Sequence, residues 1–582
     1  MEIGRRRRRN AAFVAGEVAS FIVLVALVVA HFSTDHGTYW WFLAGACLPV
    51  YVGVRRLDER NEELTDHLEA LRSVALREVK TLEGDYSVLG DGAEYVNPRH
   101  EYSFDLDIFG PGSLFNRIDR TATTGGSRVL ARRLEQPAAD PRAMGRALKE
   151  LADKPDFRAE FMSKGIGGRI DTGAMHEVLR HVSQMHVSPL AARRGSLVAA
   201  VVVLAGFYTT LLLALLGVVP AAVPVWWGTV QLMAIILMGS RTLADVRKAI
   251  GNLHRQLSGL SALARLVDGQ EFATEPCRNA QKRLGGAMES LGGLERLLRG
   301  LDRRDNFVGI IVLNVFGLTD FFLVRGFLKW QRSYMDRLPD WLDAVAEMDA
   351  SVAMATFAFN HPEAHEAEIS EDKDLVYEAR GLWHPFLGVG AVANDFTIAD
   401  RNYYIVTGAN MAGKSTFLRA LGVNYVLAMC GMPVFAERLR VSRFQLFSSM
   451  RTSDDLVHGI SYFNAELLRL KQLIGYVEAH PSHPTLIILD EILKGTNSLD
   501  KLNGSRLFLE SIAHSNVSGV IATHDLELSR MADEHPDRFH NFCFEIELGS
   551  HITYTYRIAP GVARNQNATY LLRQLLGKSA DE

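Results

Sequence analysis

Four apolar runs divide the first half of the chain. They cover residues 12–32, 39–54, 197–219 and 222–239, and the first carries one carboxylate, Glu17. A helix needs about 20 apolar residues to cross the hydrocarbon core of a bilayer, a length that the first and third runs reach and the other two narrowly miss. Short links join the runs in pairs, so the pattern predicts two transmembrane helical hairpins.

Arginine flanks both hairpins at their outer ends, whereas the links inside the hairpins carry neither Lys nor Arg. Basic flanks mark the cytoplasmic side of a membrane protein. We therefore expect a multi-pass protein of the cytoplasmic membrane with four spans, and both termini and all large segments in the cytoplasm. The flanking arginines are residues 5–9, 55–56, 193–194 and 241.

Three alternatives stay open for these segments. The first run could be a cleaved signal peptide, and the second pair could be two buried core helices. The N-terminal arginines could contact nucleic acid instead of lipid headgroups.

A further apolar segment, 307–324, contains Asn314 and Asp320, which are costly in lipid, so we expect a buried helix there.

Length, charge and cysteine content restrict the number of domains and the class of protein. A chain of 582 residues is too long for one hydrophobic core, so several domains are expected. The formal net charge of -4 gives no basic excess, and a DNA-binding surface would have to be local. The four cysteines lack the spacing of a zinc site or a disulfide framework, which fits a reducing compartment.

A glycine-rich segment near residue 410 predicts a phosphate-binding loop. Residues 408–415 are GANMAGKS, which matches G-x-x-x-x-G-K-[ST], between a β-rich run and a helical pattern. Backbone N–H groups of such a loop and the following helix N-terminus hold phosphates. We expect Lys414 to reach the β- and γ-phosphates of ATP and Ser415 to bind Mg²⁺. The predicted loop comprises Gly408, Ala409, Asn410, Met411, Ala412, Gly413, Lys414, Ser415 and Thr416.

Two apolar strands further along end in polar residues. The segment TLIILDEI, 485–492, places Asp490 and Glu491 at the tip of a buried strand. We expect Asp490 to hold Mg²⁺ and Glu491 to act as the general base that polarises the attacking water. The segment SGVIATHDL ends at His524, which would sense the γ-phosphate. The alternatives are an ordinary strand end and a structural histidine.

Together these motifs resemble one family, the MutS DNA mismatch-repair ATPases. The resemblance rests on TGANMAGKSTFLR with its Asn410-Met411 pair, on LDEILKGTNSLD and on ATHDLEL. It extends to SDDLVHGISYFNAELLRLKQLI at 453–474 and, upstream, to DLDIFGPGSLFNRIDRTATTGGSRVLARRLEQP at 105–137. It covers about residues 86–577 apart from the second hairpin. Ala409 and Ala412 replace the family's usual Pro and Gly, and both are small enough to keep the loop.

The resemblance implies a homodimer in which two ATPase domains build composite sites. Ser461 would then reach the partner's γ-phosphate in trans, although it could instead be a helix N-cap. Mismatch readers carry an N-terminal domain with a Phe-x-Glu wedge, whereas the only such triplets here, 435–437 and 508–510, fall in the ATPase region. We therefore expect a membrane-anchored variant without the mismatch-recognition domain, whose second hairpin occupies the place of levers and clamp.

The predicted architecture is a multidomain chain with two transmembrane helical hairpins, an all-α MutS-like core and lever domain, and a C-terminal α/β P-loop ATPase domain of the ABC type. Alternating strands and helices after residue 374 indicate the α/β sheet. The predicted divisions are a basic segment 1–10, the first hairpin 11–56, the first part of the core 57–195, the second hairpin 196–240, the second part of the core and lever 241–370, and the ATPase domain 371–582.

Three functions compete at this level. The first is a membrane-anchored ATPase that hydrolyses ATP at composite dimer sites to drive conformational change, with the bilayer and an unknown protein as partners. The alternative is a membrane-tethered DNA-binding repair or recombination factor, although neither the charge nor a reading domain supports DNA. The third is an ATP-driven transporter, which the absence of a Leu-Ser-Gly-Gly-Gln signature disfavours.

Overall fold

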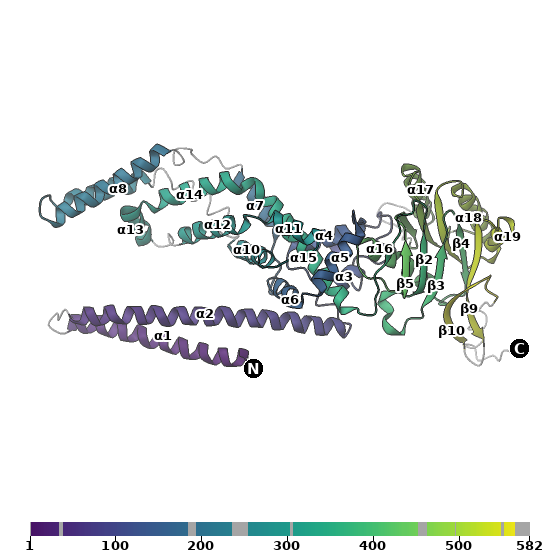
Figure 1. The fold of residues 1–582 in the computed structure, drawn as a ribbon, viewed down its shortest axis with the longest axis horizontal. Coiled ribbons are helices and arrows are strands. Elements are labelled where there is room, and N and C mark those ends of the chain that lie inside the picture. The colour runs from purple at the N-terminus through teal and green to yellow at the C-terminus, as the bar shows by residue number, and fades with distance from the viewer. Residues whose placement is uncertain are drawn as a thin grey trace.

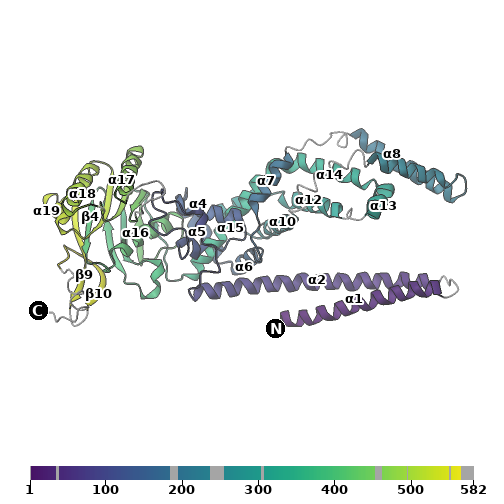
Figure 2. The same cartoon turned by 180° about the vertical axis from the view of Figure 1, so that it is seen from behind.

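The computed structural model describes residues 2–33, 39–183, 194–235, 254–302, 307–451, 462–494, 496–548 and 552–564. The molecule is elongated (Figure 1). An α/β domain lies at one end and a helical body in the middle. Two groups of apolar helices project from the other end, and the view from behind shows the same order (Figure 2). The mostly helical first part and the α/β C-terminal part agree with the sequence prediction.

The first apolar group is an antiparallel pair of long helices, α1 (Glu2–Ser33) and α2 (Tyr39–Leu82), which lie side by side (Figure 1). Apolar side chains such as Val18, Phe21 and Ile22 are exposed along α1. Helix α2 passes the predicted end of the hairpin without a break. Its 44 residues extend over about 66 Å, twice the thickness of a hydrocarbon core, so its charged second half belongs to the helical body.

The second apolar group consists of α8 (Arg194–Leu215) and the helix Ala222–Ile235. Among the described residues, two helices are long and apolar enough to cross a membrane, Glu2–Ala30 and Gly195–Leu215, and the helix after α8 is a shorter apolar one. Residues 236–239 of the fourth apolar run lie outside the described part of the chain. Four spans therefore stay a prediction.

The segment predicted as one buried helix is broken into α13 (Phe307–Gly317) and α14 (Thr319–Tyr334). Leu318 between them has a left-handed φ of 47°, and the chain bends there by 79°. The new helix starts here because Asn314 Oδ1 accepts the backbone N–H of Asp320 at 2.9 Å. From residue 311 to 317, α13 is only partly buried, which differs from the prediction.

The helical body is organised around α15 (Leu338–Asn360), which packs against α4 (Thr124–Glu135) and α5 (Pro141–Ala152). Most side chains of α15 are buried, and the helix leads into the α/β domain. The other helices of this part are α3 (Leu114–Ile118), α6 (Pro155–Ser163), α7 (Thr172–Ser183), α10 (His254–Asp268), α11 (Glu275–Arg283) and α12 (Ala287–Asp302).

A buried carboxyl joins α15 to the chain before α4. Asp349 accepts the backbone N–H groups of Ala122 at 2.9 Å and Thr123 at 2.8 Å, and the Thr123 hydroxyl at 2.6 Å. Burial raises the pKa of Asp349 to about 7, although the three donors oppose that shift. A buried polar group with all these partners fixes one arrangement of the two segments.

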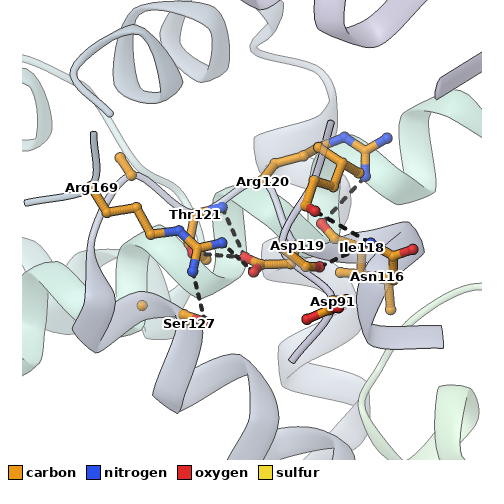
Figure 3. A network of polar contacts seen from close by, with 12 residues as sticks. Asp91, Asn116, Ile118, Asp119, Arg120, Thr121, Ser127 and Arg169 are labelled. Carbon is orange, nitrogen blue, oxygen red and sulfur yellow. Dashed lines mark hydrogen bonds and ion pairs between the residues drawn. The ribbon is translucent and has the colours of Figure 1, made fainter. Parts of the chain in front are cut away.

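A second polar network fastens α2 to the helical body. Buried Asp119 accepts the backbone N–H and the hydroxyl of Thr121, at 3.1 and 2.7 Å, and pairs with Arg169 (Figure 3). The next residue, Arg120, is also buried and donates through Nε to both carboxylate oxygens of Glu78 on α2, at 2.9 Å. The charged half of α2 is therefore held to the body by a shielded ion pair.

The C-terminal domain contains two sheets. The strands are β1 (Glu368–Ile369), β2 (Tyr377–Leu382), β3 (Asn394–Ile398), β4 (Tyr403–Gly408), β5 (Arg438–Val441), β6 (Gln445–Ser449), β7 (Thr485–Asp490), β8 (Val517–Thr523), β9 (Phe539–Leu548) and β10 (Ile552–Pro560). The main helices are α16 (Lys414–Met429), α17 (Tyr462–Ala479) and α18 (Ser498–Ile512).

The larger sheet has the order β10-β9-β4-β8-β7-β6 and is parallel except for the β9–β10 pair. The smaller sheet has the order β1-β5-β2-β3. Strands β4 and β8 are buried along their whole length, as expected for central parallel strands. Because β4, β8 and β7 are parallel neighbours, the residues that follow them meet at one edge of the sheet.

Candidate functional site

The predicted phosphate loop connects β4 to α16. Gly408 and Gly413 have φ values of 152° and 104°, and a Cβ added to Gly408 would lie 2.8 Å from the carbonyl oxygen of Phe544. Both positions therefore require glycine. Ala409 and Ala412, which depart from the usual family residues, are buried within the loop and fit there.

The Lys414 ammonium lies at the inner end of this loop. Its Nζ donates to the carbonyl oxygens of Gly408 at 2.7 Å and Ala409 at 2.9 Å. Burial lowers the pKa of Lys414 to about 8, while the charges of Asp490 and Glu491 act in the opposite direction. A lysine in the first turn of α16 adds its positive charge to that of the helix N-terminus, which suits a phosphate chain.

Ser415 and Asp490 meet across the strand edge. The Ser415 hydroxyl donates to Asp490 Oδ2 at 2.5 Å, so the first turn of α16 is joined to the end of β7. A hydroxyl and a carboxylate are oxygen donors of the kind that Mg²⁺ takes together with phosphate oxygens and water. The donor set of these two side chains therefore fits the predicted magnesium ion.

Glu491 follows β7 with a left-handed φ of 65°. Its backbone N–H donates to the carbonyl oxygen of Ala522 at 2.9 Å, and its carboxylate pairs with Lys501 Nζ on α18. Burial by itself raises the pKa of Glu491, but the hydrogen bond and charge of Lys501 outweigh it and bring the pKa below its usual value. The carboxylate is therefore ionised at neutral pH.

His524 follows β8, the strand between the phosphate loop and the two acidic residues. Burial is the main cause that lowers the pKa of His524 from its ordinary value, and the positive charge of Lys414 lowers it further. The ring is therefore neutral at physiological pH and can donate one hydrogen bond and accept another. A neutral donor beside Lys414 is suited to contact a terminal phosphate.

A cavity of about 680 Å³ joins these residues. It extends from the phosphate loop, Asp490 and His524 to the chain between β2 and β3, and Tyr556 of β10 also lines it. This volume falls in the range of small-molecule and cofactor pockets. Glu491 is not among the lining residues, because its side chain pairs with α18. The lining residues from the predicted site are Ala409, Asn410, Met411, Gly413, Lys414, Ser415, Thr416, Asp490 and His524.

Sequence reasoning missed three contributors to this site. Lys501 lies ten residues after Glu491, a spacing that matches no motif. Buried His384 lies in the chain between β2 and β3, exposed Tyr556 lies on β10, and both reach the cavity only through the fold. The Nε2 atom of His384 has no hydrogen-bond partner among the described residues. The predicted residue Ser461 lies outside the described residues, so its position stays a prediction.

A family model matches the part of the chain that holds this site. The family model of MutS domain V matches residues 404–572. Residues 404–572 thus resemble a domain of the MutS family. This MutS domain holds the phosphate loop and both strand ends described above.

Several curated MutS proteins are similar to part of this chain. The DNA mismatch repair protein MutS of Geobacillus kaustophilus is 31% identical over 240 residues, which are 40% of this chain and 26% of that protein. MutS of Ehrlichia ruminantium is 29% identical over 241 residues, 40% and 28% of the two chains. MutS of Syntrophomonas wolfei is 25% identical over 318 residues, 53% and 33%. The chain thus spans about a quarter to a third of the length of these relatives.

Proposed function

We propose that this protein is a membrane-anchored MutS-like ATPase that hydrolyses ATP with Mg²⁺ at composite sites of a homodimer and uses the cycle to drive conformational change. One observation carries the ATPase part. The ends of three neighbouring parallel strands bring the phosphate loop, the Ser415–Asp490 pair and His524 around a single cavity.

Each residue has a specific role in this proposal. Loop N–H groups and Lys414 bind the β- and γ-phosphates, and Ser415 and Asp490 hold the magnesium ion. When bound, Mg²⁺ neutralises charge that develops on the phosphate oxygens. Glu491 accepts a proton from the attacking water, and His524 donates a hydrogen bond to the γ-phosphate.

The other part of the cavity suits the nucleoside. The chain between β2 and β3 contributes Trp383, His384 and Leu387, which offer apolar surface and one imidazole. Asn394 at the start of β3 donates to the Tyr556 backbone carbonyl at 3.1 Å, so β10 is held against this wall. In the proposal the base and ribose lie here while the phosphates reach Lys414.

The homodimer would complete the site. Met411, in the phosphate loop, lines the cavity and is 76% exposed, so most of its side-chain surface is open to contact with a partner protomer. A partner protomer that covers Met411 would bring its own Ser461 toward the γ-phosphate. Closure of two such domains around ATP would move the helical body to which α16 is attached.

Membrane anchoring is the second part of the proposal. Both apolar groups project from the same end of the helical body, away from the MutS domain (Figure 1). Their exposed surfaces carry side chains such as Val18, Phe21, Val198 and Val202, which water disfavours and lipid accepts. A single bilayer could take both groups, as two hairpins with four spans, and leave the body and the ATPase domain in the cytoplasm.

A membrane-tethered DNA-binding factor is the second candidate. The relatives that match are named DNA mismatch repair proteins, which favours a function in which this protein binds DNA. The net charge of -4 works against a large DNA-binding surface. The lack of a mismatch-recognition domain stays a prediction.

One experiment tests the ATPase and separates the two candidates. ATP hydrolysis is measured with the detergent-solubilised protein alone and with homoduplex, mismatched and branched DNA. Glu491→Gln should lower kcat by at least 100-fold, and Glu510→Gln, on the exposed face of α18, should leave it unchanged. Hydrolysis that no DNA alters supports the membrane ATPase, and stimulation by one DNA supports the tethered factor. Equal rates for both variants would refute the assignment of the site.

A further inference from the structure

Helix α13 is short, apolar and placed beside the second apolar group. Its sequence FVGIIVLNVFG contains no charged residue, and its 11 residues extend over about 16 Å, half of a hydrocarbon core. Phe316 packs edge-on against Phe207 of α8 with ring centroids 5.5 Å apart. The side chains of Val312 and Phe316, one helical turn apart, are each 46% exposed.

The last turn of α13 has its carbonyl groups occupied by side chains from other elements. Gln231 Nε2, in the helix Ala222–Ile235, donates to the carbonyls of Asn314 at 3.1 Å and Val315 at 2.9 Å. The Tyr208 hydroxyl of α8 donates to the carbonyl of Phe316 at 2.8 Å.

The Thr319 hydroxyl donates to the carbonyl of Leu313 at 2.8 Å, and the Leu318 N–H to that of Asn314 at 3.2 Å, so four successive carbonyls, 313–316, accept from groups outside the helix. In water the last carbonyls of a helix are commonly left to solvent. In hydrocarbon every backbone polar group needs a protein partner, because each unsatisfied one costs several kcal/mol. The hydrogen bonds at this helix end therefore suit a place without water.

The distribution of polarity around α13 is the reverse of that in a water-soluble domain. The polar side chains Gln231, Asn314 and Asp320 are buried between the helices. The apolar side chains Val312 and Phe316 face outward. Polar residues inside and apolar residues outside are typical of protein surrounded by lipid.

We propose that α13 is a half-span that lies within the bilayer beside the second apolar group, with Val312 and Phe316 against lipid acyl chains. At Leu318 the chain turns by 79° into α14, which leads back to the helical body (Figure 1). The chain thus enters the bilayer and leaves it on the same side. The inference rests on the proposed membrane anchoring, and it gives α13 a lipid contact without adding a fifth crossing.

The test uses single cysteines that carry an environment-sensitive fluorophore. Cys47→Ala serves as the parent, because burial raises the pKa of Cys277 to about 11 and of Cys430 to about 12, and Cys543 is buried as well. These three thiols are therefore poorly reactive. Labelling of the parent measures the remaining background.

Four positions on this parent are compared in phosphatidylcholine vesicles. Val312→Cys and Phe316→Cys test α13. Val201→Cys on α8 reports the proposed span, and Leu507→Cys on α18 is an exposed apolar control in the MutS domain. We expect lipids with a doxyl group on the acyl chain to quench the first three probes at least twofold, and aqueous iodide to quench only the probe at 507.

The remaining outcomes separate the two proposals. Iodide quenching at 312 and 316 together with lipid quenching at 201 would overturn the half-span and keep the membrane anchor. Iodide quenching at all four positions would refute the anchor and the half-span together. Protection of 312 and 316 from both quenchers would also overturn the inference, since a second copy or another protein would then cover α13.

Discussion

Replacement of Asp105 by Asn should loosen the joint between the helical body and the MutS domain. Asp105 Oδ1 accepts the backbone N–H groups of Met450 at 3.1 Å and Arg451 at 2.8 Å. Its Oδ2 accepts the Ser448 hydroxyl at 2.9 Å and Arg469 Nη2 at 3.4 Å. The carboxylate thus joins the end of β6 and α17 to the helical body.

The magnitude follows from burial. The side chains of Asp105 and Arg469 are 2% and 11% exposed, so water cannot replace the interactions that are lost. An amide can keep one oxygen toward the two backbone N–H groups, but its NH₂ then faces the Ser448 hydroxyl and the Arg469 guanidinium. The Ser448 hydroxyl can rotate to accept from that NH₂, whereas the Arg469 guanidinium loses an acceptor, and one lost hydrogen bond to a charged group amounts to about 1.5–3 kcal/mol.

Asp107→Asn is the matched control. The Asp107 carboxylate pairs with Arg451 at 2.5 Å, and the two side chains are 33% and 40% exposed. Its φ of 53° suits Asn, and an exposed ion pair contributes about 1 kcal/mol or less. The free energy of unfolding is measured in urea by tryptophan fluorescence of the solubilised full chain. Equal losses for the two variants, or a loss below about 1 kcal/mol for Asp105→Asn, would refute the reasoning.

Three further predictions concern titratable groups. Lys501→Met removes the ammonium that lowers the pKa of Glu491. The acid limb of the kcat–pH profile should therefore move to higher pH, and kcat should fall by about tenfold. Lys501→Arg should restore both, and Lys471→Met should change neither. An unmoved acid limb would exclude this role for Lys501. Because the pKa of Lys414 is about 8 and phosphates bind the charged form, the Kd of a fluorescent ATP analogue should rise about tenfold per pH unit above that value, and a flat profile would contradict the assignment. The pKa of Asp349 is about 7 in the folded protein and 3.8 in the unfolded chain. Between pH 3.8 and about 7 the folded protein therefore holds a proton that the unfolded chain has lost. The free energy of unfolding should fall as pH rises through this interval, by about 4 kcal/mol at most. The difference in unfolding free energy between the wild type and Asp349→Asn, measured at several pH values, should show this slope, and a constant difference would disprove it.

Much of the site follows from sequence alone, because local chemistry determines it. A loop that approaches phosphates with its backbone needs glycines at positions such as 408 and 413, and these are visible as a spacing. A buried strand that ends in Asp490 and Glu491 is visible as an apolar run followed by carboxylates. The apolar runs of the hairpins are visible for the same reason, since the composition of each segment decides whether it can lie in lipid.

Other features depend on the tertiary structure, because their partners are distant in sequence. Asp105 and Met450 are 345 positions apart, and no local pattern predicts that they meet. Lys501 finds Glu491 only because α18 packs beside the end of β7. The last turn of α13 accepts hydrogen bonds from Tyr208 and Gln231, which are 108 and 83 positions away from their partners in the sequence. The sequence by itself therefore determined which chemical groups the site and the apolar helices contain, whereas long-range packing decided which of those groups face one another.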